Sequence, residues 1–73
     1  MVLEKNVRYM ATIKLNFLES MATNEIIAGK LRDAGFAEVS VSGVGATRSA
    51  NGRWAKDKTD AQLPPQVKEV KRI

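Results

Sequence analysis

The sequence predicts a small α+β fold: a single-layer sheet of about three strands, in β-α-β-β order, with one helix packed on one face. Three observations predict it. Apolar and polar residues alternate over residues 7–17, an amphipathic segment with helix start and stop signals covers residues 23–35, and alternation resumes at residues 39–41. A chain of 73 residues has room for one domain.

The first strand has the clearest pattern. From Val7 to Phe17 every second residue is apolar, and the residues between them are mostly polar. This period predicts one buried face and one solvated face. A slip of one residue would expose the whole apolar set, so we expect a well-defined register. Met10 lies on the polar side, where it is either a contact with another protein or an isolated exposed side chain.

A helix is predicted after this strand. Thr23 is a suitable N-cap, and Glu25 places a carboxylate in the first turn, where the helix dipole favours it. Ile27 and Leu31 are four residues apart and form an apolar stripe toward the sheet. Gly35 stands where a left-handed residue ends many helices. The start and stop signals therefore agree with the periodicity.

The second strand leads into two glycines and then a predicted hairpin. Gly43 and Gly45 interrupt the alternation, which indicates either a β-bulge or a loop. Asn51-Gly52 is the strongest turn signal, because both central positions of a type I′ turn require positive φ. The third strand would then run from Arg53 to Lys58, at an edge of the sheet.

The C-terminal segment is open to two interpretations. Leu63, Val67 and Val70 have the spacing of one helix face, and Pro65 suits the first position of a helix. The segment is short, however, and isolated helices of this length are marginal in water. We therefore expect a single α+β domain over residues 1–62, followed by a basic helix or a frayed basic tail over residues 63–73.

The composition argues against catalysis. The chain has no cysteine and no histidine, so it has no disulfide, no thiolate nucleophile and neither of the standard zinc ligands. No carboxylate pair or serine has a partner in the sequence that would support acid–base or nucleophilic chemistry. We expect no enzyme activity, no cofactor, no metal and no small-molecule substrate. No apolar run can span a membrane and no export signal precedes the domain, so the expected location is cytoplasmic.

The basic charge is unevenly placed. The net charge is +4, residues 1–42 are neutral, and residues 43–73 hold seven basic and three acidic groups. A one-sided excess favours anionic partners such as nucleic acid, although a mixed-charge solvated surface is the simpler explanation, because the excess is modest and three carboxylates lie among the basic groups. The candidate contacts for nucleic acid lie on the predicted hairpin and tail: Arg48, Arg53, Trp54, Lys56, Lys58, Lys68, Lys71 and Arg72. Trp54 would either stack on a base or pack over the sheet.

Two function classes follow. The first is a non-catalytic protein-binding module that associates with itself, for example as a homodimer, because a core this small gains stability from a partner. Met10 and Val44 are its candidate contact residues. The alternative is a nucleic-acid-binding module that uses the basic hairpin and the C-terminal tail.

Overall fold

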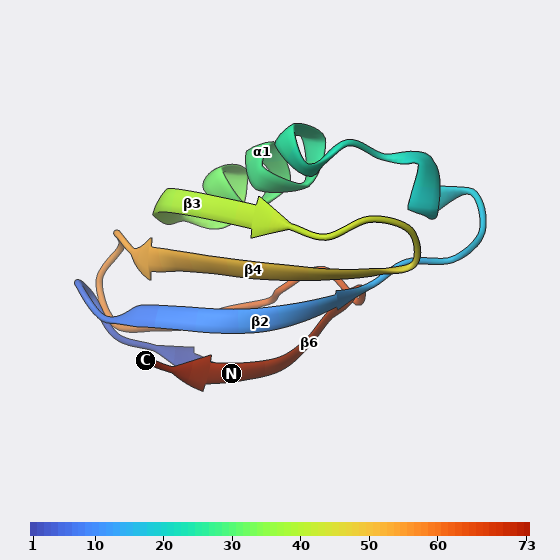
Figure 1. Ribbon diagram of the computed structural model, residues 1–73. Coiled ribbons are helices and arrows are strands. Elements are labelled where there is room, and N and C mark those ends of the chain that lie inside the picture. The colour runs from blue at the N-terminus through green and yellow to red at the C-terminus, as the bar shows by residue number, and fades with distance from the viewer.

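In the computed structural model, which describes all 73 residues, the chain forms six strands, one α-helix and one short 3-10 helix (Figure 1). In chain order the elements are β1 (Val2–Leu3), β2 (Arg8–Lys14), η1 (Glu19–Met21), α1 (Asn24–Ala34), β3 (Phe36–Ser42), β4 (Thr47–Trp54), β5 (Thr59–Asp60) and β6 (Val67–Arg72). Neither helix has the length and the apolar composition that a membrane-spanning helix needs.

The strands form two sheets, so the predicted single sheet of three strands is wrong. The main sheet has the order β3-β4-β2-β6, and every neighbouring pair is antiparallel (Figure 1). The second sheet is the antiparallel pair β1-β5. Because β4 lies between β2 and β3, these two strands run parallel and α1 connects them, which is a split β-α-β arrangement. The predicted α+β composition and the single α-helix remain.

The C-terminal segment is a strand, not a helix or a frayed tail. β6 pairs with β2 through Ile13 opposite Val67 and Tyr9 opposite Arg72, and its register shifts by one residue between these pairs. The extra residue in β6 lets Val67 and Val70 both pack on the core, although they are three positions apart. The bulge in β6 therefore produces a three-residue spacing of buried side chains, which is also the spacing of a helix face.

The predicted turn at Asn51-Gly52 is also wrong. Both residues lie within β4, where Asn51 is opposite Met10 on one side and Ser40 on the other. The β3–β4 turn lies over residues 43–46, with Gly43 and Gly45 at φ 100° and 76°. Gly52 supplies space instead of positive φ: a Cβ there would lie 3.3 Å from Phe36 Cβ and 3.3 Å from Val39 Cγ2.

The helix forms as predicted. The Thr23 side chain accepts a hydrogen bond from the Ile26 backbone N–H at 3.2 Å. At the other end Gly35 has a φ of 128° and its N–H donates to the Arg32 carbonyl. The buried side chains of α1 include Ile27 and Leu31, as the sequence indicated, and the helix packs against β3 (Figure 1).

One face of the main sheet carries the whole core. Below α1 the buried cluster is Ile13, Ile27, Leu31 and Ala50, and beside it the second cluster is Leu3, Tyr9, Trp54 and Ala61. Leu3 belongs to β1 and Ala61 directly follows β5, so the small sheet covers the same face as the helix. The opposite face of the main sheet has no second layer, and we call it the open face.

Each edge strand of the main sheet contains a β-bulge with a glutamate in the left-handed region. Glu38 in β3 has a φ of 53° and Glu69 in β6 has a φ of 52°, and both lie where the register shifts. Left-handed backbone costs an ordinary residue about 1–2 kcal/mol. Bulges and charges at sheet edges hinder the addition of another strand. The two free edges are therefore poor surfaces for strand pairing.

We expect Glu69→Gly to raise the free energy of unfolding by about 0.5 kcal/mol, because the relief of left-handed strain exceeds the added chain entropy of glycine. The control is Lys68→Gly in the regular part of β6, which should lower it by about 0.5–1 kcal/mol. Urea unfolding of the three proteins measures both changes. Equal destabilisation by the two glycines would contradict the strain at Glu69.

Candidate functional site

The residues predicted to contact nucleic acid do not lie on one surface. Arg48 and Trp54 are buried, and Arg53 is half-buried. Lys58 and Arg72 lie on either side of Glu4, with nitrogen–oxygen distances of 3.9 Å and 3.2 Å. Lys56 lies beside Gly35 at the end of α1. Of the lysines predicted to contact nucleic acid, Lys68 and Lys71 are the two that lie on the main sheet, and both are exposed.

Arg48 is a buried cation whose partners are neutral oxygens. Its side chain donates to the Gly45 carbonyl at 3.0 Å, to Asn24 Oδ1 at 2.7 Å and to the Ser20 carbonyl at 2.9 Å. The Asn24 amide in turn donates to the Gly43 carbonyl at 3.1 Å. Arg48 thus connects β4 to the β3–β4 turn, to η1 and to the start of α1, and it is not free to bind a phosphate.

Trp54 packs in the core, which decides between its two interpretations. It is 1% exposed, its indole N–H donates to the Asp57 carbonyl at 3.1 Å, and its ring meets Phe36 edge-on with centroids 5.0 Å apart. Aromatic pairs favour this arrangement. Trp54 cannot serve as a base platform from this position.

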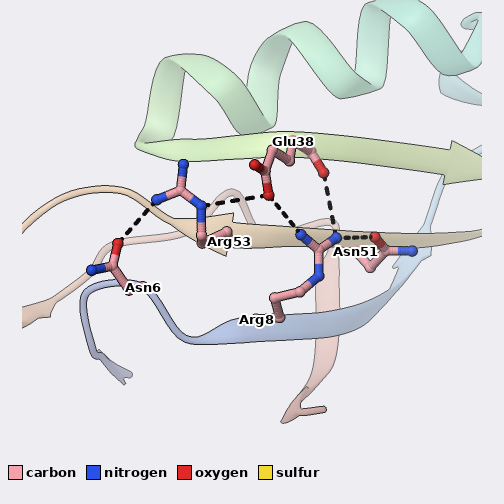
Figure 2. A network of polar contacts seen from close by, with 5 residues as sticks. All are labelled: Asn6, Arg8, Glu38, Asn51 and Arg53. Atoms are coloured by element: carbon pink, nitrogen blue, oxygen red, sulfur yellow. Dashed lines mark hydrogen bonds and ion pairs between the residues drawn. The ribbon is translucent and has the colours of Figure 1, made fainter.

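An ion network occupies one end of the open face (Figure 2). Glu38 Oε2 lies 3.1 Å from Arg8 and 3.5 Å from Arg53. Arg8 also donates to Asn51 Oδ1 at 2.7 Å, and Arg53 donates to Asn6 Oδ1 at 3.1 Å. One carboxylate therefore offsets part of the charge of two arginines, and it does so from the bulge of β3.

The largest exposed apolar group lies between β2 and α1. Phe17, Leu18 and Met21 are 84%, 76% and 78% exposed. We call residues 17–21 the protruding segment. The strand pattern predicted a buried Phe17, but β2 ends at Lys14 and the chain turns away. The two adjacent apolar residues Phe17-Leu18, which break the alternation, were the signal for this surface. The predicted contacts Met10 and Val44 are also exposed, but in other parts of the fold.

An open apolar groove lies beside the protruding segment, with a volume of about 440 Å³. Its walls come from β2, α1 and the chain that enters β6, and most of its lining is apolar. The apolar lining residues are Ile13, Leu15, Ala22, Ile26, Ile27, Leu31, Pro64 and Val67, of which Pro64 lies within the connection from β5 to β6. Glu19 and Lys30 are the charged residues of the groove.

Glu19 joins the two sides of this region. The backbone N–H of Asn16 donates to one carboxylate oxygen at 2.9 Å, and the Gln66 side-chain amide donates to the other. The Asn16 hydrogen bond first, and the Gln66 hydrogen bond second, lower the pKa of the Glu19 carboxyl below its ordinary value. The ionised form of Glu19 thus fixes η1 to the chain before β6.

The surface of the fold presents an open apolar groove, an exposed apolar segment and an ion network on the open face. No group of three or more carboxylate side chains is placed to hold a metal ion. Comparison with known proteins finds no matching family model, no matching curated protein and no matching solved structure.

We expect Arg48→Met to lower the free energy of unfolding by about 2–4 kcal/mol, because it leaves several part-buried oxygens without a donor. Arg48→Lys should recover little of this loss, since one ammonium group cannot reach three separate acceptors as the guanidinium fork does. Chemical unfolding followed by Trp54 fluorescence measures the change. A stable Arg48→Lys protein would contradict the role of the three-way contact.

We expect Glu19→Gln to make the stability less dependent on acid pH. Because folding lowers the pKa of Glu19, its contribution is complete above the unfolded pKa and is lost as the pH falls through the folded value. The wild-type protein should lose more stability than Glu19→Gln between about pH 6 and about pH 3. Urea midpoints over this range test it, with Asp33→Asn on α1 as the control. Parallel pH curves for wild type and Glu19→Gln would count against the hydrogen-bond assignment.

Proposed function

We propose that the protein is a non-catalytic binding module that associates with a second copy of itself through the protruding segment and the apolar groove. The observation that carries the proposal is the placement of Phe17, Leu18 and Met21, highly exposed, directly beside the groove. Exposed apolar clusters of this kind mark interaction sites. The cytoplasmic location expected from the sequence stays a prediction.

The shape of this surface favours a second copy as the occupant. One chain presents both an apolar projection and an apolar hollow, so two copies related by a two-fold axis would each insert the projection into the hollow of the other. Closed pairs of this kind use the same patch on both subunits. A different protein would need its own complementary pair of features.

The charges and the strand edges agree with this mode of association. The groove contains one glutamate, Glu19, and one lysine, Lys30, so neither sign accumulates where two copies would meet. The bulges at Glu38 and Glu69 make the sheet edges unsuited to strand addition. Association through the apolar surface is therefore favoured over a continuous sheet across two chains. A small core also gains stability from a subunit partner.

We expect a dimer at tens of micromolar protein, measured by sedimentation equilibrium. Phe17→Ser with Met21→Ser should weaken dimerisation by about ten- to a hundredfold, because each removes a large apolar side chain from the contact. The matched control is Met10→Ser with Val44→Ser, which removes two exposed apolar side chains away from the groove and should leave dimerisation unchanged.

Two results would contradict the proposal. The first is a wild-type protein that stays monomeric at tens of micromolar. The second is a control variant that loses dimerisation as completely as the Phe17 and Met21 variant. Far-ultraviolet circular dichroism and urea unfolding show whether each variant is folded, so a loss of dimer is not mistaken for a loss of structure.

A further inference from the structure

The open face carries a line of basic side chains along β2 and β6. In an antiparallel pair, directly opposite residues point to the same side of the sheet. Lys71 is opposite Met10 and Lys68 is opposite Thr12, so both lie on the side of the sheet that presents Arg8 and Lys14. Along the strand direction the order is Arg8, Lys71, Lys68 and Lys14. This line spans about six residues of β2, or about 20 Å.

The three lysines of this line are available for a ligand. Lys14, Lys68 and Lys71 are exposed and take part in none of the ion pairs. Lys14 makes only a long hydrogen bond of 3.4 Å to Thr47. Arg8 is different, because Glu38 and Asn51 hold its guanidinium (Figure 2).

The other half of the open face, formed by β4 and β3, carries short polar side chains. The register places Ser49 between Thr12 and Ser42, and Asn51 between Met10 and Ser40. These short side chains leave the surface flat beside the line of lysines. No aromatic ring lies there, since Phe36 and Trp54 pack on the helix side.

We propose that the open face binds the phosphate backbone of nucleic acid, with Lys14, Lys68 and Lys71 as the principal contacts. Lysine side chains neutralise phosphates and release condensed counterions, which gives salt-dependent affinity. Without an aromatic platform the face cannot stack bases, so binding is independent of sequence. Glu38 limits affinity by holding Arg8 and Arg53.

This inference does not rest on the proposed dimer. The groove lies on the helix side of the main sheet, as its lining by Ile27 and Leu31 shows, and the lysines lie on the opposite side. It also differs from the hairpin predicted from the sequence, because Arg48 and Trp54 are excluded and Lys14 is added. A dimer through the groove would leave both open faces exposed.

The test is fluorescence anisotropy of labelled oligonucleotides, in three arms: single-stranded DNA, duplex DNA and duplex RNA. With three lysine contacts, the logarithm of the duplex-DNA association constant should fall with the logarithm of salt with a slope of about −2.7. The triple variant Lys14→Gln, Lys68→Gln, Lys71→Gln should bind at least tenfold more weakly at low salt and lose most of this slope. The matched control is Lys5→Gln, Lys56→Gln, Lys58→Gln, which has the same net charge, leaves the groove and the line of lysines intact, and should bind nearly as wild type.

A second pair of variants tests the role of Glu38. Glu38→Gln frees two arginines on the open face and should raise affinity severalfold, whereas Glu25→Gln frees only Arg32 on the helix and should not. Circular dichroism confirms the fold of each variant.

Four outcomes would overturn the proposal. These are no binding of any oligonucleotide at low salt, equal losses in the two triple variants, equal effects of the two glutamine variants at Glu38 and Glu25, and binding of polyglutamate as tightly as nucleic acid. The last would assign the face to acidic protein instead.

Discussion

A buried guanidinium organises the end of the molecule where the groove lies. Arg48 extends from the core side of β4 and its three donors meet the β3–β4 turn, η1 and the first residue of α1. No carboxylate accompanies it, so its charge is spread over three neutral oxygens, and no buried side-chain polar atom is left without a partner. Hydrogen bonds from a charged donor are stronger than neutral ones, and their loss in a buried place is costly. Because η1 presents the protruding segment and α1 forms a wall of the groove, the proposed dimer surface depends on this one side chain.

The main sheet separates two kinds of surface. The alternation of β2 sends Tyr9 and Ile13 into the core and leaves Arg8, Met10 and Lys14 on the opposite side. The helix side of the main sheet carries the core, the groove and the small sheet. The groove on this side is lined mostly by apolar side chains. The open face is polar and mostly basic, with one glutamate at its end. A protein contact and a phosphate contact are therefore proposed on surfaces that share a strand and do not compete for side chains.

The sequence was informative where local signals agreed with the final packing. The alternation in β2 and the caps of α1 at Thr23 and Gly35 predicted those elements well. It misled where a bulge changed the spacing, since Val67 and Val70 then resembled a helix face. It misled at Gly52 because a glycine can serve close packing as well as a turn. The buried side of β4 is a regular alternation of Arg48, Ala50, Gly52 and Trp54, and the assumed turn cut it in two. The open face depends on which strands are neighbours, and a single sequence does not contain that information.

The central place of β2 has a consequence for the order of folding. Its two neighbours are β4 and β6, and β6 is the last element of the chain, while β1 at the start pairs with β5. Every one of these pairings joins segments far apart in sequence, so loop closure must precede most of the stabilising contacts. Chains dominated by such non-local contacts fold slowly for their size. During synthesis, β2 would remain without its second neighbour until residues 67–72 had emerged. Until then one edge of β2 and the core side chains beneath it stay accessible, and exposed strand edges and apolar side chains of this kind make a partly folded chain prone to aggregation.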